Sequence, residues 1–186
     1  MKRSQLEFIP EYYGNYINEL DDIELSDALI KYGPELFRNE FSALEKAGDK
    51  TYAENKWTIK QIIQHIIDSE RVFFYRALCF ARGDNTVLPS FDENIYAEMS
   101  GSDARDLNDL ITEFKSVRES GILLYKSFNN EMLNRTGICY NKKISPAAIG
   151  FVIAGHTLHH FNVIKERYIP LGEKSYEPKI RTFMIM

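Results

Sequence analysis

Three of the four histidines in this sequence fall within one short segment, residues 155–168, which reads GHTLHHFNVIKERY. His156 and His160 are four positions apart, and His159 lies between them. Residues four apart lie side by side on a helix, so the imidazoles of an HxxxH pair can ligate one metal ion. The fourth histidine, His65, lies far away in the sequence and could supply a third nitrogen ligand.

The helix predicted around this pair places both imidazoles in its apolar face. His156 and His160 fall within about 20° of Ile149, at the centre of a stripe of isoleucine and valine, whereas His159 falls about 80° away. A buried neutral imidazole has one donor and one acceptor, and both need partners. A divalent ion satisfies two such rings at once, but a histidine on an apolar face is more often a core residue with protein partners. Metal ligation and structural burial therefore both remain open on this pattern.

His65 belongs to a second predicted helix, residues 58–82, with Thr58 as its N-cap and Gly83 as its stop signal. His65 lies about two turns into that helix, and the HxxxH pair lies about three turns into its own. In a bundle the three histidines could therefore lie at a similar height along the bundle axis. Three histidines would leave coordination positions open, as in catalytic zinc sites. Thr157 occupies the glutamate position of an HExxH zinc protease, which excludes that class.

Four amphipathic patterns with turn signals between them predict one all-helical domain over residues 1–186, most simply a four-helix bundle. Pro34 should kink or divide the first helix, Ser145 and Pro146 should open the last, and Pro170 should end it. No strand is predicted. The four helices are expected at about residues 25–44, 58–82, 106–133 and 145–168.

A long connection, residues 83–103, separates the second and third predicted helices. Connections of this length are uncommon inside a compact domain unless they are functional or cross it. We expect Phe91 and Tyr96 to anchor the segment on the bundle, or to form a lid over a metal. The segment is long enough to cross the bundle, so the second and third helices could be parallel.

The composition argues against some classes of protein. The 186 residues carry a formal net charge of -4, and without a basic excess we expect no nucleic-acid partner. No signal peptide and no window of about 20 apolar residues was recognised, so we expect no membrane partner and a cytoplasmic location. Cys79 and Cys139 form no CxxC pair and suit a reducing compartment, with Cys79 packed as a small hydrophobe.

Three segments, spanning about residues 56–168, resemble the DinB-like superfamily of four-helix-bundle metal-dependent enzymes, which includes bacillithiol transferases. They are KWTIKQIIQHIIDSERVFFYRALCFARGD, LPSFDENIY and IAGHTLHHFNVIKERYI. The resemblance implies a mononuclear metal site with His65, His156 and His160 as ligands. Several relatives have an acidic residue where this chain has Thr157. Nitrogen ligands suit zinc and nickel, and also iron.

These observations predict a metal-dependent enzyme with a small-molecule substrate, either a transferase acting on a low-molecular-weight thiol or a hydrolase. A non-catalytic metal-binding protein and a helical interaction protein are the alternatives, and dimerisation through a bundle face is compatible with all of them. Arg167 could bind an anionic substrate group or form a salt bridge at the bundle end. The segment DSER, residues 68–71, could supply hydrogen bonds that support the site, but Glu70 and Arg71 are expected at the surface, solvated or paired.

Overall fold

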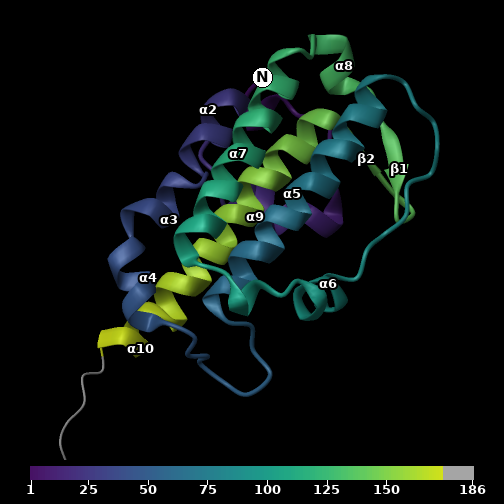
Figure 1. Ribbon diagram of the computed structural model, residues 1–186. Coiled ribbons are helices and arrows are strands. Elements are labelled where there is room, and N and C mark those ends of the chain that lie inside the picture. Colours follow the sequence, from purple (N-terminus) through teal and green to yellow (C-terminus); the bar gives the residue numbers. More distant parts are fainter. Residues whose placement is uncertain (174–186) are drawn as a thin grey trace, which may run out of the picture.

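The computed structural model describes residues 1–173 and is dominated by a four-helix bundle (Figure 1). One of its four positions is taken by a broken helix, and the other three by long continuous helices. The broken helix comprises α2 (Leu25–Lys31), α3 (Glu35–Asn39) and α4 (Phe41–Ala47), and the long helices are α5 (Ile59–Ala81), α7 (Leu107–Lys126) and α9 (Pro146–Arg167). The bundle agrees with the predicted all-helical fold.

Shorter elements surround the bundle. They are three single turns of 3₁₀-helix (Arg3–Gln5, Glu11–Tyr13 and Ser102–Ala104), the helices α1 (Gly14–Asn18), α6 (Glu93–Met99), α8 (Asn130–Asn134) and α10 (Ile169–Glu173), and the strands β1 (Gly137–Cys139) and β2 (Lys142–Ile144). The two strands form an antiparallel hairpin, which contradicts the expectation of no strand. Its tight turn holds Tyr140 and Asn141 at positive φ, 47° and 58°, a conformation that asparagine tolerates better than most residues.

The three long helices begin within one residue of their predicted starts. Thr58 accepts a hydrogen bond from the backbone of Gln61 in a capping box, and Asp106 caps α7. Ser145 caps α9, with Pro146 in the first turn. The first predicted helix is divided more than expected, because a second break at Glu40 separates α3 from α4 in addition to the break at Pro34.

Helices α5 and α7 run parallel, as the long connection suggested. Their contacts advance in the same direction along both helices: Arg71 Nη2 lies 2.6 Å from Glu113 Oε1, and further along both helices a Cβ on Gly121 would overlap the Phe74 ring. Helix α9 is antiparallel to both. The Tyr168 hydroxyl, near its end, donates to the carbonyl of Trp57, which precedes α5.

The connection between α5 and α7 is ordered and packs along the bundle. Leu88 and Ala97 are its buried anchors, and the backbone of Leu88 is hydrogen-bonded to Ile138 and Tyr140 beside the hairpin. The expected anchors Phe91 and Tyr96 pack on each other, with ring centroids 5.2 Å apart, and Tyr96 remains 45% exposed. The connection is thus packed as predicted, but chiefly by other residues.

A buried ion pair joins the four positions of the bundle. Arg118 on α7 is bonded to both carboxylate oxygens of Glu70 on α5, and its Nη2 lies 3.0 Å from the Thr157 hydroxyl on α9. Its Nη1 donates to the carbonyls of Leu29 and Tyr32, at 2.6 and 2.8 Å, where α2 ends. The expectation of a surface position for Glu70 was therefore wrong, because its side chain is fully buried against Arg118.

The expectation that no stretch is apolar enough to span a membrane was wrong by length and composition. The stretch Pro146–Glu173 is long and apolar enough to cross a membrane by length and composition. Yet 72% of its most apolar window is buried inside the protein. The central helix of a soluble bundle has the same composition, so the apolar character of α9 follows from its place in the core.

We predict that Arg118→Met destabilises the protein by about 3–5 kcal/mol, because it leaves the Glu70 carboxylate buried without its partner. Lys115→Ala is the control on the same helix, since it breaks only an exposed pair with Glu119 and should cost less than about 1 kcal/mol. Urea denaturation measures both. Equal, small losses for the two variants would contradict a structural role for the buried pair.

Candidate metal centre

Three imidazole rings from two helices, α5 and α9, meet inside the bundle. The Nε2 atom of His156 lies 3.0 Å from Nε2 of His65 and 3.0 Å from Nε2 of His160. One ligand atom from each ring lies within 4.8 Å of the other two. The antiparallel packing of α5 and α9 brings His65 to the level of the HxxxH pair, so the structure brings together all three residues singled out in the sequence.

Hydrogen bonding among the rings cannot satisfy this arrangement. A neutral imidazole nitrogen either donates one hydrogen or accepts one, yet His156 Nε2 faces two other ring nitrogens at hydrogen-bond distance. The other nitrogen of the same ring, Nδ1, is buried and has no partner among the described residues. Three nitrogens aimed at one region suit a cation that accepts their lone pairs, and the donor set fits a divalent transition metal.

Burial keeps these imidazoles neutral. It lowers the pKa of His65 to about 4. The pKa values of His156 and His160 are also well below the usual histidine value, first because of burial and then because the neighbouring imidazoles repel a second positive charge. An unprotonated imidazole is the form that binds a metal, so the cluster is prepared to act as a ligand set at neutral pH.

Aromatic side chains surround the three imidazoles. The ring of Trp57 lies 4.8 Å from that of His65, measured between centroids, and the rings of Phe73 and Tyr16 lie 6.1 and 5.4 Å from that of His156. None of these three residues was predicted to belong to the site. Phe73 follows the helical apolar spacing of α5, which does not distinguish it from a core residue, and the segment that contains Tyr16 has no recognisable motif.

Tyr16 reaches the histidines because α1 packs directly on α9. The contact occurs at Gly155, where a Cβ atom would come within 2.1 Å of the Tyr16 carbonyl oxygen. The missing side chain of Gly155 therefore permits the close approach. Gly155, immediately before His156, thus allows α1 to pack over the metal ligands.

The remaining candidates lie around the cluster and not within it. Thr157 points away from the ligands to the pair of Arg118 and Glu70, with its hydroxyl 3.4 Å from Glu70 Oε1. His159 packs against Tyr16, with ring centroids 5.3 Å apart. Arg167 stacks over the Tyr52 ring at 6.0 Å, and among the described residues it forms no ion pair, so its predicted salt bridge is not seen there.

A cavity of about 580 Å³ opens beside the cluster, between α1 and α9. Its volume falls in the range of small-molecule sites. Tyr16 lines this cavity, and its ring also lies against that of His156, so the cavity adjoins the cluster. The cavity is lined by Tyr12, Asn15, Tyr16, Asn18, Glu19 and His159.

We predict that Gly155→Ala destabilises the protein and displaces α1 from α9, although alanine normally favours a helix over glycine by about 1 kcal/mol. The added methyl group overlaps backbone, which cannot rotate away. Gly14→Ala is the matched control, because a Cβ there would meet only side-chain atoms at 3.8 and 3.9 Å. Thermal unfolding and the Tyr16 ring signals in NMR spectra report the two effects. Unchanged Tyr16 signals in Gly155→Ala would contradict the packing described here.

The metal-free protein should lose stability as the pH falls from about 6.5 towards 4.5. A histidine with a lowered pKa in the folded state binds its proton more readily when unfolded, so acid favours unfolding by up to about 1.4 kcal/mol per group and pH unit. His156→Leu should show a shallower dependence, because it removes one such group. Urea denaturation in the presence of a chelator measures the slopes, and identical slopes for both proteins would argue against buried, neutral imidazoles.

Comparison with known proteins places these features in a family. The sequence profile of the DinB superfamily matches residues 5–164. A protein of Oceanobacillus iheyensis named "Putative metal-dependent hydrolase OB0413" is 25% identical over 162 residues, which cover 87% of this chain and 80% of the relative. "Putative metal-dependent hydrolase BH0277" of Halalkalibacterium halodurans is 29% identical over 87 residues, 47% of this chain and 50% of its own. The profile match also covers residues 5–55, which precede the segments whose resemblance to the family was recognised in the sequence.

One solved structure shares the fold. YfiT from Bacillus subtilis, described as "a probable metal-dependent hydrolase with an unusual four-helix bundle topology", superposes with a TM-score of 0.69. The match covers 89% of this chain and 91% of YfiT at 16% sequence identity. At this identity the likeness establishes the fold alone.

Proposed function

Because the chain belongs to the DinB superfamily, we propose that it is a metal-dependent enzyme in which His65, His156 and His160 hold one divalent ion. The observation that carries the proposal is the convergence of three Nε2 atoms on one region, with no hydrogen-bonding scheme that satisfies them. The names of the relatives agree with metal dependence. Zinc and nickel are the ions that we favour, with iron as a third choice, because all three accept imidazole ligands.

The ion would supply a Lewis acid that lowers the pKa of a water or a thiol bound to it. The residues of the chain hold the three imidazoles neutral and in place. Trp57, Phe73 and Tyr16 enclose the ligands in apolar surface, which strengthens electrostatic interactions there. The cavity beside Tyr16 adjoins the cluster and offers room for part of a small-molecule substrate.

Two reactions fit this arrangement. Hydrolysis is supported by the names of the relatives. Transfer of a low-molecular-weight thiol is supported by the ligand set, because the described cluster consists of histidines without a carboxylate that could act as a general base. Thr157 offers no substitute, since its hydroxyl is engaged with Arg118 and Glu70. A thiol needs only to be deprotonated by the cation to become a nucleophile.

Partners and location remain predictions from the sequence. We propose a small molecule as the substrate and a cytoplasmic enzyme, without nucleic-acid or membrane partners. A homodimer through a bundle face remains compatible with the proposal. The alternatives, a non-catalytic metal-binding protein and a helical interaction protein, are distinguished by the experiments that follow.

We predict that protein purified without a histidine tag carries about one divalent ion per chain, measured by elemental mass spectrometry. Replacing His65, His156 or His160 with alanine should reduce occupancy at least tenfold, because each substitution removes one of three ligands. His159→Ala is the matched control on the same helix, and it should retain the metal. Near-stoichiometric metal in the double variant His156→Ala, His160→Ala would falsify the site.

The metal-loaded protein can then be tested for both reactions. We expect either hydrolysis of small esters and amides or transfer of a thiol to an electrophilic dye, with the activity lost in the same alanine variants. A protein that binds the ion but accelerates neither reaction would support the non-catalytic alternative. A protein without bound metal after purification and reconstitution would support the interaction protein.

A further inference from the structure

Arg76 is a buried cation close to the histidine cluster. It lies on α5, 11 residues after His65, so its side chain leaves the helix within about 20° of the same direction. Only 4% of its surface is exposed. A buried guanidinium normally has an acidic partner, because removing a charge from water is costly.

No such partner is present in residues 1–173. Arg76 Nη2 donates to the carbonyl of Pro89 at 2.7 Å, and the guanidinium lies 5.8 Å from the ring centroids of both Phe73 and Phe91. Its Nε and Nη1 have no hydrogen-bond partner there, yet they are not sealed from solvent. Arg118, the other buried arginine, is bonded through all three of its nitrogens. The contrast leaves Arg76 with free donors and an unbalanced charge.

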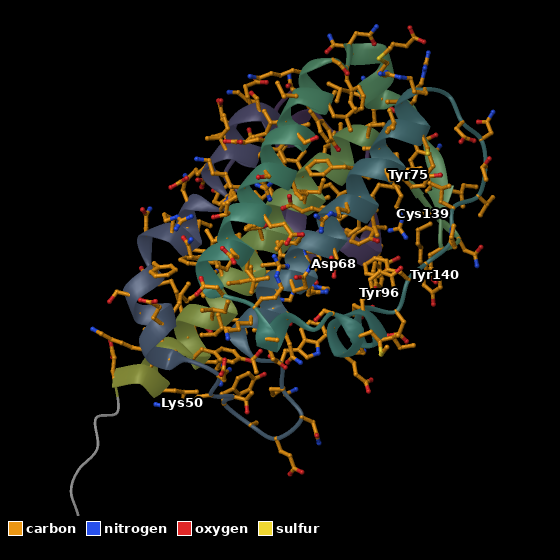
Figure 2. The ribbon with its side chains drawn as sticks, viewed as in Figure 1. Lys50, Asp68, Tyr75, Tyr96, Cys139 and Tyr140 are labelled. Carbon is orange, nitrogen blue, oxygen red and sulfur yellow. The ribbon has the colours of Figure 1, made fainter. Side chains whose placement is uncertain are left out.

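The groups around Arg76 are aromatic or neutral at pH 7. Burial and the nearby Cys139 raise the pKa of Tyr13 to about 12, while the positive charge of Arg76 opposes this rise. Burial also raises the pKa of the Cys139 thiol, again opposed by Arg76. Figure 2 shows Cys139 and Tyr96 on the side of α5 that faces the hairpin and α6. Arg76 is therefore a single positive charge in a largely aromatic environment.

Phe73 connects this environment to the metal ligands. Its ring centroid lies 6.1 Å from that of His156 and 5.8 Å from the guanidinium carbon of Arg76. These two distances limit how far the imidazole and the guanidinium can be apart. A ligand only a few bonds long, passing over Phe73, would be long enough to contact both.

We propose that Arg76 binds an oxyanion group, such as a carboxylate, of the substrate whose reacting end lies at His65, His156 and His160. The planar fork of an arginine matches the two oxygens of a carboxylate, and Phe73 and Phe91 provide apolar surface for the carbon chain beside it. The inference rests on the proposed function. It assigns to Arg76 the role of anion binding that the sequence had suggested for Arg167.

A matched pair of thiols tests the proposal. Cobalt-loaded protein is titrated with 6-mercaptohexanoate or with 6-mercaptohexan-1-ol, and the thiolate-to-cobalt absorption band reports binding. We expect the wild type to bind the carboxylate about tenfold more tightly than the alcohol, as charge-assisted hydrogen bonds typically provide. Arg76→Gln should abolish this preference while leaving the affinity for the alcohol unchanged. Arg82→Gln, which removes a charge just after the same helix, should retain it.

Arg76 could instead serve only to anchor the connection through Pro89. In that case, Arg76→Gln would weaken both thiols equally, and Arg76→Lys would not restore the preference for the carboxylate. Either result, or a wild type without any preference, would overturn the proposal. Partial recovery of the preference in Arg76→Lys supports it, because the lysine keeps the charge.

A metal-free arm separates this inference from the proposed function. Hexanoate should shift the Arg76 Nε–Hε signal in NMR spectra of metal-free protein in a saturable manner, and 1-hexanol should not. If cobalt does not bind at the histidines but hexanoate shifts this signal, the metal site is wrong and the anion site is supported. If cobalt binds but hexanoate produces no shift and the thiols show no preference, the anion site is wrong.

Discussion

The buried guanidinium of Arg118 is the constraint on which the position of the site depends. It joins α7 to Glu70 on α5, to Thr157 on α9 and to the carbonyls where α2 ends. Thr157 directly follows His156, and Glu70 lies five residues after His65. The same contacts that hold the bundle together therefore also set the level at which His65 faces the HxxxH pair. Desolvation makes such a network costly unless every donor is used, and here all three guanidinium nitrogens are bonded.

Two segments outside the long helices, the N-terminal segment and the connection after α5, bring side chains next to the histidine cluster. The N-terminal segment brings Tyr16 to His156 across Gly155, and the connection after α5 brings Phe91 and the Pro89 carbonyl to Arg76. The parallel arrangement of α5 and α7 requires a connection long enough to return along the bundle. This segment thus has a structural purpose as well as a place beside the site.

The parts of the account that could be predicted from sequence are those with a local signal. Helical periodicity placed His156 and His160 on the inward face of their helix, and the capping residues Thr58 and Ser145 located the starts of α5 and α9. Glu70 was missed because a buried charge is recognisable only from its partner, 48 residues away in the sequence. Tyr16 and Arg76 depend on packing between distant segments. The hairpin was missed because its two strands have three residues each, too few to display an alternating pattern.

The most direct test of the metal centre is a crystal structure of the zinc-loaded protein, with anomalous scattering recorded on both sides of the zinc absorption edge. The account predicts one anomalous peak between the Nε2 atoms of His65, His156 and His160, at about 2.0–2.1 Å from each. It also predicts that the protein leaves at least one coordination position to water or a ligand. A peak elsewhere on the protein, or a fourth protein ligand that closes the coordination sphere, would contradict an open three-histidine centre.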